Sequence, residues 1–233
     1  MPATVVTGDG NAGEFVRMAA AELGRELPFA PYHGTLNLEG RRGEVVEGLP
    51  NTVVTDVGDG DYCTGVELYA CRIDGVLASV IVPDVPGYPA DKIELLAPVH
   101  VRSLFDLTDG DAVHLDPPGT LANPAVHRIN PDALGSFGAV VVDDRLYTPT
   151  TDGRGERTGS SPASRGALER LGAGVVDAVV ERDPDSGHVS VERVLHCLAS
   201  MDVDPGGAAF VTADRDVVPA PFSVLSANAL APK

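Results

Sequence analysis

Two polar side chains, Thr35 and Asn37, stand two residues apart in the run Gly34-Thr35-Leu36-Asn37-Leu38. On a β-strand, residues two apart point to the same side. A hydroxyl and an amide oxygen are hard, neutral ligands that suit a Mg²⁺ ion shared with nucleotide phosphates. Thr35 and Asn37 are therefore candidate metal ligands. The alternative is that both side chains only pair with backbone at the end of a strand.

A glycine-rich loop precedes the first helical pattern and consists of Gly8, Asp9, Gly10, Asn11, Ala12 and Gly13. Glycines let backbone N–H groups approach a phosphate, and the N-terminus of a helix adds partial positive charge. No Gly-Lys-Ser/Thr follows, so the loop is not of the Walker A type. Taken by itself, it is also compatible with an ordinary turn.

A third group of candidates surrounds Glu94, a carboxylate in an otherwise apolar stretch. Such a group is costly to bury without a partner. Arg102, at the end of the segment Val99, His100, Val101 and Arg102, could pair with Glu94 or could contact a nucleotide. The turn Asp109-Gly110-Asp111 is common in barrels and by itself indicates no function.

The composition indicates a soluble, cytoplasmic protein. Its 233 residues carry a net charge of −17, and its only lysines are Lys92 and Lys233. An acidic surface argues against nucleic-acid binding and favours adaptation to high salt, with an ordinary acidic protein as the alternative. No apolar run reaches the ~20 residues that span a bilayer. The cysteines Cys63, Cys71 and Cys197 fit neither a disulfide framework nor a zinc site.

The elements that must position these candidates change in character along the chain. The first part predicts one helix, residues 14–27, and many short strands, which favours a small β-barrel. These strands are residues 4–6, 34–38, 45–46, 51–57, 64–73, 76–82, 91–98 and 112–115, with a short helical turn at 101–105.

The second part alternates strands and helices, which predicts a small α/β domain with a parallel sheet. The expected strands are residues 137–142, 175–180 and 208–212, and the expected helices are 161–171 and 189–201. A proline-rich segment separates the two parts. The sequence thus predicts a barrel domain at 1–116, a linker at 117–134 and an α/β domain at 135–233.

Two strings in the first part resemble the archaeal CTP-dependent riboflavin kinases. They are Pro31-Tyr32-His33-Gly34-Thr35-Leu36-Asn37, and Glu94-Leu95-Leu96-Ala97-Pro98 followed by Arg102 and the Asp-Gly-Asp turn. The resemblance covers residues 3–116. It implies a six-stranded cradle-loop barrel and transfer of the CTP γ-phosphoryl group to riboflavin, giving FMN and CDP.

The resemblance also implies the roles of particular residues. The loop from Gly8 to Gly13 and the segment from Val99 to Arg102 would hold CTP. Thr35 and Asn37 would bind Mg²⁺, and Glu94 would touch the flavin.

The sequence departs from this family's pattern at several positions. The stretch from Asp84 to Tyr88 replaces a threonine and a histidine, and Pro86 falls about where a flavin-contacting threonine would sit. Ala12 stands for a usual glycine. A module that binds flavin or nucleotide without catalysis is therefore the alternative.

The second part faintly resembles haloacid-dehalogenase-type phosphatases, through Asp143, Asp144 and Thr148 and through the acidic run at residues 213–216. Arg145 stands where a second aspartate is expected. We therefore predict a degenerate, non-catalytic domain. A bifunctional kinase and phosphatase is the less favoured alternative.

Overall fold

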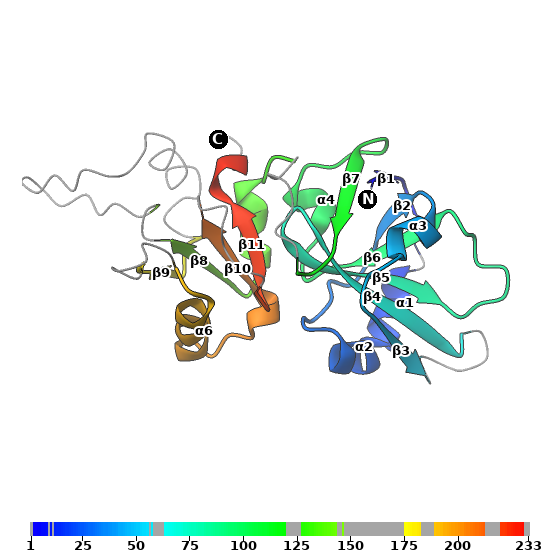
Figure 1. Cartoon of the computed structure of the whole chain (residues 1–233), viewed down its shortest axis with the longest axis horizontal. Helices are drawn as coiled ribbons and strands as arrows, with labels where there is room; N and C mark the ends of the chain where they lie inside the picture. Colours follow the sequence, from blue (N-terminus) through cyan, green and yellow to red (C-terminus); the bar gives the residue numbers. More distant parts are fainter. Residues whose placement is uncertain are drawn as a thin grey trace, which may run out of the picture.

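The computed structural model describes residues 2–8, 10, 12–55, 57, 63–119, 127–143, 146, 175–182, 189–212 and 220–230. They form a β-barrel with short helices and, beside it, a small parallel sheet (Figure 1). Among these residues, no helix combines the length and apolar character needed to cross a membrane.

Six antiparallel strands close the barrel in the order β4-β5-β6-β2-β1-β7, with β7 returning to β4. The strands are β1 (Pro2–Val5), β2 (Leu36–Glu39), β4 (Gly65–Ile73), β5 (Val76–Pro83), β6 (Lys92–Leu96) and β7 (Ala112–Asp116). A further strand, β3 (Asn51–Thr55), pairs with the first half of β4. The predicted six-stranded barrel is confirmed.

Alternating side chains decide which residues face out of the barrel. On β6, Ile93 and Leu95 are buried in the barrel core, and Glu94 points to the other side. On β2, Leu36 and Leu38 are likewise buried in that core. Because the strand period is two, Asn37 and Glu94 both face outward.

The helix predicted at residues 14–27 is two short helices, α1 (Ala12–Met18) and α2 (Ala20–Glu26). Backbone hydrogen bonds still cross the break, from Ala19 N to Phe15 O (2.9 Å) and from Leu23 N to Ala19 O (2.9 Å). The buried side of these helices, including Val16 and Leu23, packs on outward apolar residues of the barrel strands.

The strand predicted at residues 45–46 is wrong, because these residues end the helix α3 (Arg42–Val46). Two β-branched residues favour a strand only weakly, and burial can override that preference. Val45 reaches the barrel core while its amide donates to Arg41 O at 3.1 Å. The short helix near residue 101 is confirmed as α4 (Val101–Leu104).

The second body is a four-stranded parallel sheet in the order β11-β10-β8-β9, which confirms the predicted parallel sheet. Its strands are β8 (Ala139–Asp143), β9 (Ala178–Val180), β10 (Ala208–Thr212) and β11 (Ser223–Ser226). The strand β11 was not expected from the sequence. The helix α6 (Val191–Ser200) confirms the one predicted at 189–201, whereas the helix predicted at 161–171 lies outside the described residues.

The two faces of the parallel sheet bury different neighbours. One face packs against α6 through Val141 and Phe210. The other face, with Val140, joins the barrel core through residues of the 3₁₀ helix η1 (Pro131–Ser136), and Ile129 is fully buried there. The segment predicted to be a linker thus includes packed residues, and the domain boundaries stay a prediction.

A buried arginine joins the barrel to the second body. Arg72, near the end of β4, is 1% exposed. Its guanidinium donates to backbone carbonyls of Gly75 (2.8 Å), Pro118 (3.0 Å) and Phe222 (3.1 Å), and also to that of Ala220. Burial lowers the pKa of Arg72 to about 10. Since Ala220 and Phe222 precede β11, this side chain fastens β11 to the barrel.

The hairpin between β4 and β5 fits directly against β11. Its turn residues Asp74 and Gly75 have φ values of 46° and 88°. The amide of Val224 donates to Gly75 O (3.1 Å), and the amide of Leu77 donates to Ser223 Oγ (3.1 Å). The contact is so close that a Cβ on Gly75 would lie 1.9 Å from Val224 O.

We predict that Gly75→Ala destabilises the protein more than Gly110→Ala. Gly110 also has a positive φ (96°), but nothing lies within 4 Å of a Cβ there. Both variants should lose about 1 kcal/mol from left-handed backbone strain. Only Gly75→Ala should lose roughly 2 kcal/mol more, because β11 must move. Urea unfolding measures both, and equal losses would contradict this docking.

Candidate functional site

Three oxygen-bearing side chains meet on the outer face of β2 and β6. Asn37 lies directly opposite Glu94 in the antiparallel pair. The Asn37 amide Nδ2 is 3.4 Å from Thr35 Oγ1, and Thr35 Oγ1 is 3.5 Å from Glu94 Oε1. The structure therefore brings the two predicted metal ligands together with the predicted flavin contact.

This donor set fits a magnesium ion, because hydroxyl, amide and carboxylate oxygens are the ligands that Mg²⁺ prefers. In this structure the Asn37 Nδ2 points toward Thr35. Rotating the side-chain amide by 180° would exchange Nδ2 and Oδ1 and bring the oxygen to the side of a metal ion. Among the described residues, no group of three or more His, Cys, Asp or Glu side chains could hold a metal ion. Thr35 and Asn37 stay predicted ligands.

The glycine loop lies against these ligands. A Cβ on Gly8 would lie 2.2 Å from Asn37 Nδ2, and a Cβ on Gly13 would lie 3.0 Å from His33 O. Gly10 adopts a φ of 83°, and Ala12 begins α1. Asp9 and Asn11 are outside the described residues. The backbone at Gly8 thus passes so close to Asn37 that any side chain at Gly8 would displace the Asn37 amide.

Arg102 does not pair with Glu94, so that alternative from the sequence is wrong. Its guanidinium lies 2.7 Å from Asp109 Oδ1 and donates to the backbone oxygen of Val6 (2.5 Å). The Thr7 hydroxyl donates to Asp109 Oδ2 (2.5 Å). The hydrogen bonds from Thr7 and Arg102 lower the pKa of Asp109. Arg102 therefore holds the stem of the glycine loop.

The Asp-Gly-Asp turn, to which the sequence assigned no role, supplies the other half of this anchor. Gly110 N donates to Val5 O (2.9 Å), and Val5 N donates to Asp111 O (2.8 Å). The turn is thus joined to the last residue of β1, just before the glycine loop. Sequence reasoning missed Thr7 and Asp109 because they are 102 residues apart.

One pocket opens between the segment that carries Tyr32 and Gly34 and the start of α4. Its lining includes Thr35 and all four residues predicted to hold a nucleotide, namely Val99, His100, Val101 and Arg102. The exposed Tyr32 ring lies 5.1 Å from the His100 ring, tilted by 47°. The predicted metal ligand Thr35 and the predicted nucleotide segment therefore share a pocket.

Glu94 has partners that the sequence did not reveal. The Tyr88 hydroxyl donates to Glu94 Oε2 at 2.5 Å, and Lys92 Nζ lies 3.7 Å from Oε1. The Glu94 side chain is 13% exposed. Burial, followed by the hydrogen bond to Glu94, raises the pKa of Tyr88. The phenol therefore stays protonated and donates a hydrogen bond to the carboxylate.

Asp143, the first residue of the phosphatase-like string in the second body, is part of a buried ion pair. Asp143 is fully buried, accepts from Arg182 Nε (2.9 Å) and Thr212 Oγ1 (2.8 Å), and is paired with a second guanidinium nitrogen of Arg182. Asp144, Arg145, Thr148 and residues 213–216 are outside the described residues. The degenerate, non-catalytic character of this body stays a prediction.

The cysteines form no disulfide among the described residues, and all three are free. Cys63 and Cys71 are buried, and Cys197 is partly exposed on α6. Burial raises the pKa of Cys71 to about 12, which leaves its thiol protonated and unreactive. No role in the site follows for them.

Comparison with known proteins identifies the barrel. Residues 5–116 match the family model CTP-dep_RFKase, described as a domain of unknown function (DUF120). The chain is 33% identical over 120 residues to a riboflavin kinase of Pyrobaculum calidifontis, covering 48% of this chain and 57% of the relative. It is 37% identical over 95 residues to that of Methanosarcina mazei, covering 38% and 42%.

A third relative corresponds to the barrel alone. The riboflavin kinase of Aeropyrum pernix is 32% identical over 126 residues, which are 49% of this chain and 94% of the relative. The chain thus spans about half the length of the first two relatives and nearly all of the third. With the closed six-stranded barrel and this match, the chain belongs to the CTP-dependent riboflavin kinase family.

Proposed function

We propose that the barrel transfers the γ-phosphoryl group of CTP to the ribityl 5′-hydroxyl of riboflavin, giving FMN and CDP. Family membership supports the reaction type, since its relatives are named riboflavin kinases. The observation that carries the proposal is the approach of the glycine loop to the candidate metal ligands, with a Gly8 Cβ position 2.2 Å from the Asn37 amide.

The arrangement suits phosphoryl transfer because that reaction needs positioning and neutralisation of charge more than covalent chemistry. Backbone N–H groups of the glycine loop can donate to phosphate oxygens. Mg²⁺, held by Thr35 and Asn37, would neutralise phosphate charge when bound. Glu94 Oε1 can accept a hydrogen bond from the flavin substrate on the same outer face.

A module that binds without catalysis is the second candidate. It is favoured by the stretch from Asp84 to Tyr88, where Pro86 replaces the expected threonine. The substitution removes one hydroxyl from the acceptor side and leaves the glycine loop and Thr35 and Asn37 unchanged. Loss of turnover with retained binding of CTP would identify this case.

We also propose that the protein works at high salt. With a net charge of −17, its carboxylates repel one another in dilute buffer, and salt screens that repulsion. Screening of that repulsion should raise the stability of the folded chain. Activity is therefore best measured in molar KCl as well as at low ionic strength.

The first prediction of this proposal is that the purified chain forms FMN from riboflavin with CTP and Mg²⁺. ATP, GTP and UTP in parallel reactions test the choice of donor, and EDTA tests the need for metal. FMN is separated from riboflavin by chromatography and detected by fluorescence. Binding of CTP without any FMN in either salt condition would favour the binding module.

Asn37→Ala should lower kcat/KM by about a hundredfold or more, because loss of one ligand weakens metal-assisted charge stabilisation by several kcal/mol. The Mg²⁺ concentration that gives half-maximal activity should rise as well. Asn51→Ala, at an exposed asparagine on β3, is the matched control and should behave as wild type. An unchanged Mg²⁺ dependence in Asn37→Ala would rule out the metal role.

Gly8→Ala should weaken CTP binding roughly tenfold or more, because the new methyl group would overlap the Asn37 amide. The free energy of unfolding should change by no more than about 1 kcal/mol, since the loop is at the surface. Gly24→Ala, where nothing lies within 4 Å of a Cβ, serves as control. Calorimetric titration with CTP and Mg²⁺ measures binding, and wild-type affinity in Gly8→Ala would contradict the assignment of the loop.

A further inference from the structure

The connection between β5 and β6 is fastened at both ends and folds back onto the outer face of the barrel. At its start, Asp84 N donates to Gly65 O (2.8 Å), and Thr64 Oγ1 donates to Asp84 Oδ2 (2.9 Å). At its end, Gly40 N donates to Asp91 O (2.9 Å). The connection therefore has a defined path over the strands that carry the candidate site.

Tyr88 lies in the middle of this connection and is itself held in place. Its amide donates to Val85 O at 3.1 Å, closing a turn in which Gly87 has a φ of 79°. The Arg42 guanidinium lies 4.9 Å from the centre of the Tyr88 ring and also donates to Lys92 O at 3.0 Å. Lys92 Nζ lies 5.8 Å from the same ring. Two cations thus contact the aromatic ring, an arrangement that is attractive.

The Tyr88 hydroxyl makes the two oxygens of Glu94 different. Oε2 accepts the short phenolic hydrogen bond of 2.5 Å. Oε1 has longer contacts, 3.5 Å to Thr35 Oγ1 and 3.7 Å to Lys92 Nζ. A hydrogen bond to a charged group is stronger than one between neutral groups, so the phenol fixes the rotation of the carboxylate.

We propose that Tyr88 is a positioning residue for substrate recognition in this chain. By holding Glu94 Oε2, it presents Oε1 to a hydrogen-bond donor of the acceptor substrate, an imide N–H or a hydroxyl of the flavin. The inference rests on the proposed function. It assigns part of acceptor binding to residues 84–88, the stretch whose sequence is unlike the expected family pattern.

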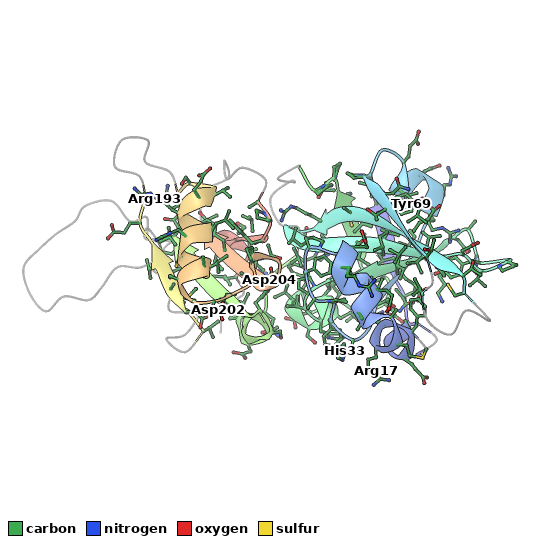
Figure 2. The ribbon with its side chains drawn as sticks, turned by 90° about the horizontal axis from the view of Figure 1, so that it is seen from below. Arg17, His33, Tyr69, Arg193, Asp202 and Asp204 are labelled. Atoms are coloured by element: carbon green, nitrogen blue, oxygen red, sulfur yellow. The ribbon has the colours of Figure 1, made fainter. Side chains whose placement is uncertain are left out.

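A matched pair elsewhere on the barrel separates positioning from mere stabilisation. On β4, the Tyr69 hydroxyl donates to Glu67, which is also a partly buried phenol-to-carboxylate hydrogen bond. Figure 2 shows Tyr69 well apart from His33, which is two residues before Thr35. Tyr69→Phe therefore removes the same kind of bond and leaves the contacts of Glu94 in place.

The test measures riboflavin binding by the full chain in the absence of nucleotide and metal. The signal is the quenching of flavin fluorescence. Tyr88→Phe keeps the ring and its cation contacts and removes only the hydroxyl. Its Kd for riboflavin should rise about tenfold, as expected when a hydrogen bond to a charged group is lost. In turnover, KM for riboflavin should rise similarly while KM for CTP stays within about twofold. Tyr69→Phe should match wild type in every measurement.

A double-mutant cycle with Glu94→Gln tests whether Tyr88 acts through Glu94. Tyr88→Phe should then have little further effect on riboflavin binding, because the carboxylate that it positions is gone. Additive losses in the cycle would overturn the inference. So would a Kd within twofold of wild type in Tyr88→Phe, or an equal rise of both KM values.

The outcomes for the inference and for the proposed function are distinct. If the wild-type chain binds riboflavin but never forms FMN, the kinase proposal is overturned. The role of Tyr88 is then still tested by the Kd for riboflavin. If the wild-type chain forms FMN and Tyr88→Phe changes neither Kd nor KM for riboflavin, the kinase proposal stands and the inference is overturned. Failure of the wild-type chain to bind riboflavin at all overturns both. Urea unfolding of each variant shows whether a loss of binding comes from a loss of fold.

Discussion

The buried guanidinium of Arg72 is the point at which the barrel, its longest hairpin and the second body meet. Arg72 pairs with Asp116 in the ladder by which β7 closes the barrel onto β4. Its side chain donates to the hairpin at Gly75 and to the chain entering β11. Burying a charge costs several kcal/mol unless its donors are satisfied. Arginine suits this place because its planar group offers five N–H donors, and four backbone carbonyls accept hydrogen bonds from it here, so no carboxylate partner is needed.

The closed barrel in turn fixes the candidate site. Since the inner side chains of β2 and β6 fill the core, their neighbours must face outward, and the register places Asn37 opposite Glu94. The glycine loop can reach these residues because its stem is tied to the turn at Asp109 through Thr7 and Arg102. Asn37 and Glu94 are thus held on rigid strands, and Thr35 is held by its hydrogen bond to Glu94, as precise positioning requires.

The sequence was most informative where a period repeats. Alternation predicted the barrel strands, and apolar strands separated by helical patterns predicted the parallel sheet. It failed at residues 45–46, where two valines gave too short a pattern to outweigh local helical hydrogen bonds and burial. It also failed for β11, a four-residue edge strand that is held on its other side by the distant hairpin at Gly75.

For the site, the sequence identified the residue types but not all their partners. Spacing indicated that Thr35 and Asn37 share a face, and the structure places Glu94 with them. The partner of Arg102 could not be derived, because Asp109 and Glu94 were both acids within reach in sequence. Tyr88 was visible only as a departure from a pattern. Its contact with Glu94 depends on a turn at Gly87 and on anchors from β4 and from Gly40 after β2, which no local pattern encodes.

Besides the contacts of Arg72 and of η1, the second body meets the barrel backbone to backbone at two places within the described residues, and these fix its position better together than either could alone. One is the hairpin at Gly75 against Val224. The other lies where Gly206, in the 3₁₀ helix η2 (Pro205–Gly207), meets Pro28, since a Cβ on Gly206 would overlap Pro28 O. Pro28 opens the segment that runs through Tyr32, at the edge of the pocket, to Thr35. A contact of backbone with backbone leaves no flexible side chain to absorb movement, so the second body directly supports the segment that leads into the site.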